Sequence, residues 1–401
     1  MSGLLEPLIA AAAPEQRIAL QSLKLPGARD ERWRYSSLRA LNQRTFKHQP
    51  IVTAQHPDSF TSTTASLSPR IVFVDGHYDA AQSDIAALGD AITLNPSASS
   101  ADAPQQWPFA IAAAACSATL DIRMAASTAS PIHLVSITTA MAQDAIVQQS
   151  LRIELAANVE ALVVHHRLGD ADSNALANHW RALVLADGAK LHWLETADEG
   201  ERASIVIGTR AVLGRSSHLD IGEVATGAAL YRHDIDITLA GAHSQLAIRG
   251  CTMVAKRRHA DIHIDVRHRA RDTQADIVWR GIADQRGHSI FTGQLTVEAG
   301  ADGADAALSN KNLLLSRQAE VDTRPILEIH ADEVKAAHGA TVGRLDEQAL
   351  FYLRSRGIDE AEARRILQVA FARAPLLQIA PAELRDIALA ALARSLPEDV
   401  T

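Results

Sequence analysis

The stretch Asp261-Ile-His-Ile-Asp-Val-Arg267 carries the pattern that decides the fold. In it Ile262, Ile264 and Val266 alternate with polar residues, the period of two expected for a strand with one buried face. The same alternation is found in 151–155, 234–239 and 294–297, and Gly or Asp-Gly breaks separate such segments. From Ile132 to Val297 the sequence therefore predicts a long series of short strands.

The arrangement of these strands has three possible forms. No clear helical segment of about a dozen residues separates them, which argues against repeated βαβ units. A sandwich, a barrel and a β-solenoid all stay open. We favour the solenoid, because the strand–turn rhythm continues without hairpin signatures such as Asn-Gly, although it has no strict repeat motif. A solenoid needs covered ends, and we expect the helical segments at both termini to cap it.

The N-terminal part has a different character. Residues 1–45 have leucines at helical spacing, and the Ser- and Thr-rich stretch 47–69 is expected to be a linker. We predict a strand at Arg70–Val74 that runs into a turn at Asp75-Gly76. Residues 84–118 are rich in alanine and interrupted by prolines, so mostly helical or irregular structure is expected there.

Helical signals return near the C-terminus. Asp346 and Asp359 are placed as N-caps, Gly357 ends the first helix, and Pro381 stands at the start of a third. We therefore predict a domain of mostly helical structure at 1–125, a strand core at 126–337 and a helical domain at 338–401.

Composition excludes several functions. There are 47 acidic against 39 basic residues, a net charge of −8, which argues against general binding to nucleic acid or to an anionic membrane. No apolar run is long enough to span a membrane and no secretory leader is recognisable, so we expect the cytosol. The two cysteines, Cys116 and Cys251, exclude a four-thiolate site within the chain.

The common catalytic motifs are missing from the sequence. We find no GxxxxGK[ST] or GxGxxG in a strand–turn–helix setting, no GxSxG and no HExxH. The sequence therefore gives no apparatus for nucleotide hydrolysis, hydride transfer or metalloproteolysis, and we predict a protein that is not an enzyme.

Seventeen histidines are the unusual count, and two groups of them fall on predicted strands. One group is His259, His263 and His268, and the other is His165 and His166. Imidazoles at alternate positions of a strand could converge on a metal ion. The favoured interpretation is that they are solvent-facing polar positions of strands whose Ile and Val face inward.

Paired carboxylates on the same strands suggest an alternative function. Asp261 with Asp265, or Asp234 with Asp236, could act as general acid and base on a polysaccharide. The alternative is thus a β-helical carbohydrate-active lyase or hydrolase, although aromatic residues make up only 4%. A purely structural solenoid also stays possible. The basic cluster 256–259 is expected to be a turn.

One segment, 331–346, joins the strand region to the C-terminal helices. In it His338 precedes Gly339, and Gly343 follows. Glycines let a backbone turn sharply, so we expect a loop that exposes the imidazole. Because functional residues concentrate on loops, His338 is the best candidate metal ligand.

Residues 331–372, ADEVKAAHGATVGRLDEQALFYLRSRGIDEAEARRILQVAFA, closely resemble the C-terminal region of the SufB/SufD family, the scaffold subunits of the Suf iron–sulfur cluster assembly machinery. Asn312–Ser316, Ala319–Ile329 and the segment Arg29–Tyr35 are also similar to that family. The length, the N-terminal helices and the scarcity of cysteine resemble its SufD branch more than its SufB branch.

The resemblance implies a right-handed parallel β-helix with helical domains before and after it. It implies a scaffold that pairs with SufB through the end of the β-helix, binds the SufC ATPase through its C-terminal helices and binds no nucleotide itself. A homodimer is an alternative state of the chain when it is alone. The resemblance also implies that His338, with a cysteine of SufB, holds a transient iron–sulfur cluster. Family members commonly have cysteine where this chain has Ala336, so the histidine would work without that thiol.

Overall fold

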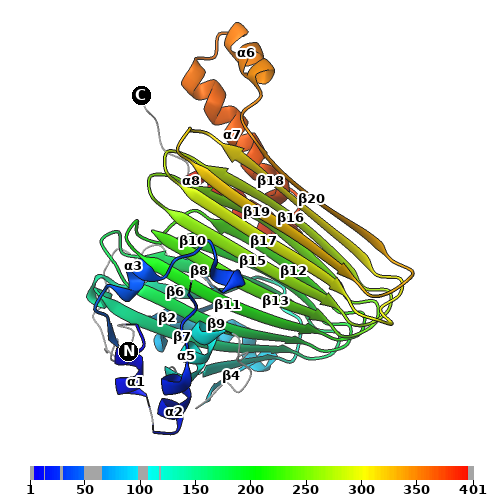
Figure 1. The fold of residues 1–401 in the computed structure, drawn as a ribbon. Coiled ribbons are helices and arrows are strands. Elements are labelled where there is room, and N and C mark those ends of the chain that lie inside the picture. The colour runs from blue at the N-terminus through cyan, green and yellow to red at the C-terminus, as the bar shows by residue number, and fades with distance from the viewer. Residues whose placement is uncertain are drawn as a thin grey trace.

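A parallel β-solenoid of about eight turns forms the centre of the molecule (Figure 1). The computed structural model describes residues 4–12, 14–27, 30–48, 66–97, 107–116 and 119–395. From β5 onward, successive strands alternate between two sheets, so that each pairs in parallel with the strand two positions before and after it. The predicted solenoid is confirmed, and the sandwich and the barrel are wrong.

The two sheets have ten strands each. Sheet A consists of β1 (Lys47–His48), β4 (Ile92–Ser97), β5 (Thr119–Met124), β7 (Ala145–Leu155), β9 (Leu176–Leu185), β11 (Ser204–Leu213), β13 (Leu230–Leu239), β15 (His259–His268), β17 (His288–Val297) and β19 (Glu320–Ile329). Sheet B consists of β2 (Arg70–Val74), β3 (His77–Asp84), β6 (Ile132–Thr138), β8 (Glu160–Gly169), β10 (Lys190–Asp198), β12 (His218–Ala225), β14 (Gln245–Val254), β16 (Gln274–Ala283), β18 (Asp305–Leu314) and β20 (Lys335–Gly343).

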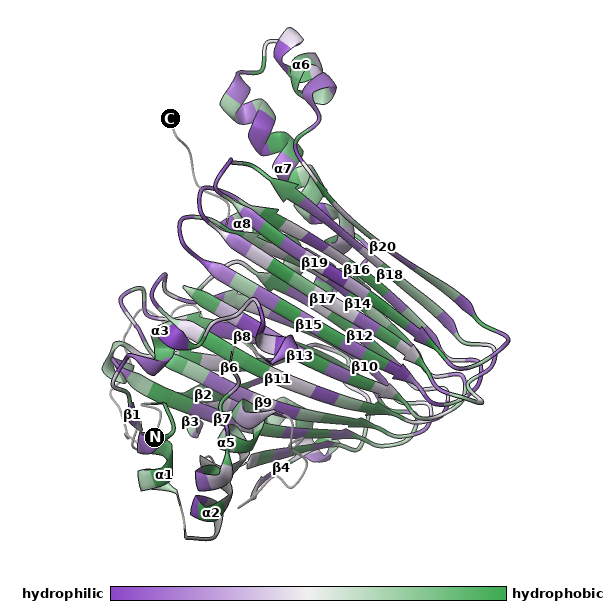
Figure 2. Ribbon diagram, in the orientation of Figure 1, coloured by the Kyte–Doolittle hydropathy of each residue, from purple (hydrophilic) through white to green (hydrophobic). Residues whose placement is uncertain are grey.

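The interior between the sheets is filled by rows of aligned side chains. Since strands pair without register shifts, a residue that faces inward on one turn lies over an inward residue of the next. Ile262, Ile264 and Val266 are fully or almost fully buried members of these rows. Figure 2 shows the resulting alternation of apolar and polar residues along the strands. The period of two in the sequence is therefore the signature of this interior.

The corners of the solenoid repeat in space although the sequence has no repeat motif. Between an odd-numbered strand and the next even-numbered one lies a residue with positive φ, whose N–H donates to a carbonyl of the following corner. These residues recur at nearly constant spacing: Asn158, Gly188, Ser216, His243, Asp272 and Gly303. The corner thus repeats its backbone conformation and its hydrogen bond while its side chains vary.

The first end of the solenoid is closed by antiparallel strands. The turn at Asp75-Gly76 is confirmed and joins β2 to β3 as a hairpin, and β4 pairs antiparallel with β5. Within 84–118 the expectation of helical or irregular structure is wrong for β4, because Ile92 and Leu94 face the core while Thr93 is exposed. Most of the expected linker, residues 49–65, lies outside the described residues.

Helices cover the outer faces of the sheets, and this corrects the expectation that they cap the ends. The N-terminal helices and α5 pack on sheet A, and α7 and α8 pack on sheet B. The N-terminal and central helical segments are α1 (Glu6–Ala11), α2 (Pro14–Ser22), η1 (Glu31–Trp33), α3 (Arg39–Asn42), η2 (Ala86–Ala91), α5 (Pro108–Cys116) and η3 (Ala140–Ala142). The outer rows of both sheets are apolar where helices cover them, for example at Ile146 and Val224.

The three predicted C-terminal helices are confirmed as α6 (Glu347–Ser355), α7 (Glu360–Leu376) and α8 (Ala382–Ser395). Asp346 and Asp359 cap the first two, each accepting backbone N–H bonds in the first turn. α6 projects beyond the solenoid, and α7 runs from it back onto sheet B (Figure 1). None of the helices in the described part of the chain has the length and apolarity to cross a membrane. The division into three domains stays a prediction.

Replacing Ile277 by alanine tests the inward rows. Ile277 is fully buried inside the solenoid, whereas its neighbour Val278 faces outward and is half-buried. We expect Ile277→Ala to lower the free energy of unfolding by about 2–5 kcal/mol, and Val278→Ala by about 1 kcal/mol or less. Urea unfolding of both variants measures this. Equal losses would contradict the assignment of inner and outer faces.

Candidate functional site

The last turn of the solenoid is open. β19 is the terminal strand of sheet A and β20 that of sheet B, and within the described residues each has a strand neighbour on one side only. Most side chains of β20 are exposed, whereas those of β18 alternate between buried and half-buried or exposed. Unpaired N–H and C=O groups on two parallel edges are a ready template for pairing with another chain.

His338 lies on this last turn, in the middle of β20. The expectation of a loop at this position is wrong: neither Gly339 nor Gly343 has positive φ, and the strand pairs in register with β18. A Cβ added at either glycine would meet nothing within 4 Å. The glycines therefore do not bend the backbone, and they leave bare the face of the strand opposite to the imidazole.

An inward row of the solenoid ends at His338. Through the register of sheet B this row contains Ile132, Val163, Trp193, Ile221, Ile248, Ile277, Leu308 and finally His338. Every earlier member is an apolar residue and is buried. An aliphatic side chain would continue the row, so an exposed imidazole at this position is not explained by packing. His338 is therefore the leading candidate residue of the open end.

The same edge offers few other ligands from this chain. Ala336, two residues before the histidine, is partly buried against the core and presents only a methyl group. In the described part of the chain no three or more His, Cys, Asp or Glu side chains are arranged to hold a metal ion. Any cluster at His338 would need further ligands from outside the described residues.

The strand histidines neither form a metal site nor face solvent as expected. His165 and His268 point into the solenoid and are at most 1% exposed. His263 faces outward but is buried at 5% exposure and bonds Asp261 at 2.8 Å. His166 stacks on His133, with ring nitrogens 3.0 Å apart. The solvent-facing interpretation is wrong for His165 and His268 because they face inward, and for His263 because its outward face is covered. The basic cluster 256–259 lies at the turn before β15, as predicted.

The paired carboxylates are held in ion pairs with arginines. Arg232, itself fully buried, binds both Asp234 and Asp261, and Arg267 binds Asp265 at 3.1 Å. Burial disfavours ionisation of Asp234 and Asp261, but the neighbouring Arg232 outweighs it and lowers both pKa values. They are thus fixed as anions with a structural task, and the carbohydrate-active alternative gains no support from them.

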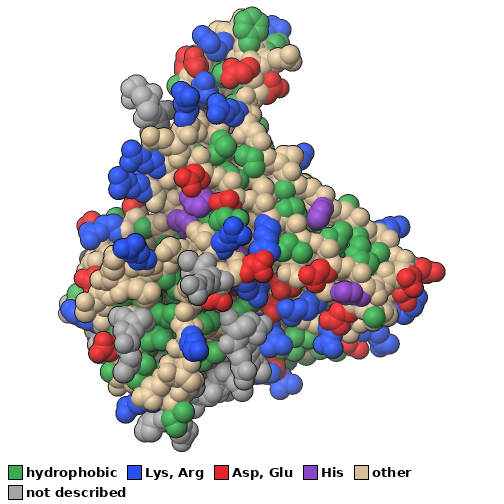
Figure 3. Space-filling view, viewed as in Figure 1, with side chains coloured by type: hydrophobic (Ala, Val, Ile, Leu, Met, Phe, Trp, Pro, Cys, Tyr) green, Lys and Arg blue, Asp and Glu red, His purple; other side chains and the backbone are tan. Residues whose placement is uncertain are grey.

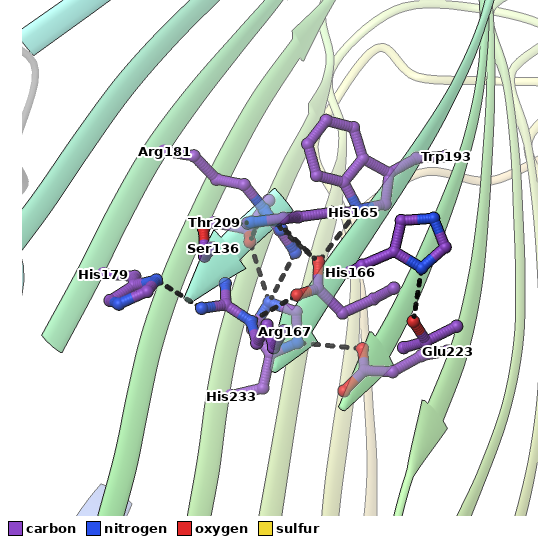
Figure 4. Close-up of polar contacts among 12 residues, drawn as sticks. Ser136, His165, His166, Arg167, His179, Arg181, Trp193, Thr209, Glu223 and His233 are labelled. Carbon is purple, nitrogen blue, oxygen red and sulfur yellow. Dashed lines mark hydrogen bonds and ion pairs between the residues drawn. The ribbon is translucent and has the colours of Figure 1, made fainter. Parts of the chain in front are cut away.

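A buried ionic network crosses the interior, and the sequence reading missed it. Glu195 on β10 accepts hydrogen bonds from Arg167 on β8, from Arg181 on β9 and, at 3.1 Å, from Trp193. Arg181 comes from the opposite sheet, and its guanidinium lies 4.5 Å from the Trp193 ring centroid. Figure 4 shows these arginines converging between the sheets. The parity of Ala161 and Val163 places Arg167 inside, a signal available in the sequence.

The network extends one turn further along the interior. His233 binds Glu223 at 2.8 Å and Thr209 at 2.7 Å, and the Tyr231 hydroxyl donates to Glu223 at 2.8 Å. Glu223 and His233 come from opposite sheets. In addition to packing, these polar bridges hold the two sheets at a fixed distance. A buried charge that lost its partner would raise the free energy of the folded state.

Burial sets the protonation of these groups. It lowers the pKa of His165 to about 4, and that of His179 well below its usual value. Burial alone would raise the pKa of Glu195, but Arg167 and Arg181 bring it well below the usual range. Near neutral pH His165 and His179 are therefore neutral and Glu195 is charged.

Cys251 is not available as a ligand. It lies on the outer face of β14 under the C-terminal helices and is 1% exposed. Burial raises the pKa of its thiol to about 12, so the thiolate needed to bind a metal is not formed near neutral pH.

Comparison with known proteins gives this open-ended solenoid a family. The model described as "SUF system FeS cluster assembly, SufBD core domain" matches residues 137–371, which include His338. The chain is 30% identical to "Iron-sulfur cluster assembly protein SufD" of Escherichia coli (strain K12), over 96% of this chain and 93% of that protein. The chain belongs to the SufB/SufD family. Within the SufB/SufD family, its similarity supports the SufD branch.

Other relatives agree with this assignment. A protein of Synechocystis sp. named as an iron-sulfur cluster assembly SufBD family protein is 28% identical over 91% of this chain and 86% of its own length. SufD of Bacillus subtilis (strain 168) is 39% identical over 29% of this chain and 26% of its own length. These SufB/SufD proteins are named as assembly proteins, which indicates a role in iron–sulfur cluster assembly.

Acidification is expected to destabilise the fold through its buried histidines. The pKa values of His165, His259 and His268 are lowered by burial from 6.5 to about 4, so between these values the unfolded chain binds more protons than the folded one. Their stabilisation is complete above pH 6.5 and is lost toward pH 4, at about 1.4 kcal/mol per pH unit for each. Urea unfolding between these pH values measures the loss.

Glu199 provides a control for this pH dependence. Burial raises the pKa of its carboxyl from 4.5 to about 7, so it takes up a proton in the folded state and opposes the histidines. In Glu199→Gln this opposition is gone, and stability should fall more steeply with decreasing pH. The same slope in the variant and the wild type would contradict the assignment for Glu199.

Proposed function

We propose that this chain is a non-catalytic scaffold subunit of a SufBCD complex, in which it pairs with a SufB subunit and binds the SufC ATPase. The iron–sulfur cluster is the cargo of this complex and is held transiently between the two scaffold subunits. The observation that supports this proposal most directly is the open last turn, where a row of buried apolar residues ends in the exposed His338.

Pairing through β19 and β20 fits the exposed edges of both sheets. A partner solenoid that presents two parallel edges would continue both sheets at once and cover Ile329 and Val342, which are 41% and 44% exposed. When SufB is missing, a second copy of this chain would meet the same edges. The homodimer is thus proposed as the state of the isolated subunit.

The chemistry of His338 suits a shared site. A neutral imidazole binds iron, while the last turn, 320–343, contains no cysteine, and the described residues hold no group of three or more metal-ligating side chains. A cysteine thiolate from the partner would complete the ligand set, and the paired edges would fix the separation of the two side chains. Since Ala336 carries no sulfur, the contribution of this subunit rests on the imidazole.

The C-terminal helices present an exposed surface that suits a protein partner. α7 and α8 are anchored on sheet B by Leu376, Leu384 and Leu392, while α6 projects and leaves Phe351 72% exposed and Tyr352 57% exposed. Figure 3 shows apolar side chains at this projecting tip with charged groups around them. Exposed aromatic residues surrounded by charges are typical of a protein-binding surface. We assign this surface of α6 to the binding of SufC. As the compartment of the complex we propose the cytosol.

Replacing His338 tests the ligand role. We expect His338→Ala to leave SufB and SufC bound, and to lower the cluster content of the complex after anaerobic reconstitution by about tenfold or more, since even indirect changes around a metal cost that much. Cluster content is measured by iron analysis and visible absorption. His338→Cys, which keeps a metal-binding group, should restore part of it.

His330 is the matched control, because it is also exposed and directly follows β19 but lies outside the inward row. His330→Ala should leave cluster content unchanged. Normal cluster content in His338→Ala, or equal losses in both variants, would remove the assigned role.

Replacing the exposed aromatics tests the SufC surface. The double variant Phe351→Ala, Tyr352→Ala should weaken SufC capture at least tenfold, since aromatic anchors at interface centres contribute about 2 kcal/mol or more each. Met141→Ala, at a side chain 71% exposed on η3, is the control. Binding is measured by titration with purified SufC. Retained affinity in the double variant would place the SufC site elsewhere.

A further inference from the structure

Residues 30–36 form a strap that crosses the outer face of sheet A. The strap contains η1 and runs over β13, β15 and β19, which follow it by roughly two to three hundred residues in the sequence. Figure 1 shows it as a dark blue segment in front of the strands. It makes an ionic or polar contact at each end, and the two ends differ in burial.

One end of the strap is anchored in the buried carboxylates. The Ser36 hydroxyl donates to Asp261 and lies 2.8 Å from Nε2 of His259. Arg232 donates to the carbonyl oxygen of Arg32 at 2.9 Å, and its guanidinium carbon lies 3.7 Å from the centroid of the Trp33 ring. Since Arg232 is fully buried and bonded to two aspartates, this end is fixed to β13 and β15.

The other end of the strap reaches the last turn of sheet A. Glu31 forms an ion pair with Arg324 on β19, and Arg32 lies 3.7 Å from Asp265 on β15. Glu31 is 72% exposed and Arg324 is 37% exposed, so this contact is at the surface. It is the only strap contact to β19 among the ion pairs of the described residues.

Between these two ends the strap spans a polar hollow of about 70 Å³. Its lining includes Thr292 and Gln294 of β17 and Ile326 of β19, together with Glu31 and Arg32 of the strap. A space of this size holds about two water molecules. The strap therefore crosses over β17 and is attached to β13 and β15 on one side and to β19 on the other.

β19, to which the strap is attached through Arg324, has few stabilising contacts of its own. β19 has no fully buried residue, and it pairs with β17 on one side only. Val321 and Leu327 of β19 pack against the same core as Ala336 of β20, so the two strands of the last turn share their inner support. An attachment on the outer face of β19 consequently limits fraying of the turn that carries His338.

We propose that the strap is a positioning element of the last turn, with Glu31 and Arg324 as its positioning residues: it holds β19, and through the shared core β20, in the geometry that a partner subunit binds. The partner part of this inference rests on the proposed function. The strap does not touch the cluster, and it acts by keeping the edge of sheet A and the row that ends in His338 aligned before the partner arrives.

Charge reversal at the exposed contact tests this inference without disturbing the buried anchors. In Arg324→Glu, like charges face each other, and hydrogen exchange of the backbone amides of β19 and β20 should accelerate about two- to fivefold, the range expected from an exposed ion pair. The swapped double variant Glu31→Arg, Arg324→Glu should restore the exchange rates. Exchange is followed by mass spectrometry on the full-length chain.

The matched control is Arg269→Glu, which breaks the exposed pair with Glu298 at 3.3 Å next to β15 and β17 without touching the strap. It should leave β19 and β20 unchanged. Unchanged exchange in Arg324→Glu, an equal change in the control, or no restoration by the swap would overturn the inference.

Binding of SufB by the same variants tests the partner part. Arg324→Glu should weaken SufB capture severalfold, and the swap should restore it; faster exchange with unaltered SufB capture would overturn this part. If the wild-type chain captures no SufB, the proposed function fails, while the exchange experiment still decides whether the strap holds the last turn.

Discussion

In-register stacking of parallel strands is the constraint on which the rest of this molecule depends. Each strand copies the facing of the strand beneath it, so every side chain inherits an inside or outside position from the turn before. Each new turn can therefore extend an apolar row by adding one more apolar side chain. A polar residue at such a position departs from the pattern of the whole row. The same stacking delivers His338 to the last turn as the final member of a row that began at Ile132. A loop could not hold an imidazole in so fixed a relation to two sheet edges.

Charge is placed in two different ways around this framework. Inside, Glu195 and Glu223 tie the sheets together through arginine, histidine and tyrosine partners. Outside, Arg232 gathers Asp234 and Asp261 beneath the N-terminal strap. Both sets are costly to bury and are satisfied only when distant segments meet, so they favour one arrangement of the chain over others. In the last turn and in the projecting α6, by contrast, few side chains are buried.

The sequence predicts much of this fold from local physics, because the period of two at 261–267 follows directly from the inward row. Caps at Asp346 and Asp359 act within a few residues and were equally readable. Burial of the outer faces cannot be predicted from local sequence, since His263 is covered by a strap more than two hundred residues earlier in the chain. His165 differs from the prediction for a related reason: the interpretation assumed that polar residues face water, although the parity of Val163 places His165, like Arg167, inside. The ligand role of His338 stays a prediction, and the loop expected at this position is a strand.

The two ends of the solenoid differ, and this limits how copies can associate. At the first end the outermost strands β3 and β4 run antiparallel to their neighbours, while at the other end β19 and β20 run parallel to theirs. A solenoid open at both ends would add subunits head to tail and grow into a filament. Here the hairpin at Asp75-Gly76 reverses the chain at the first end, so the strands at the two ends run in different senses relative to their neighbours. Head-to-tail addition in one orientation therefore cannot continue the parallel pairing of the ladders.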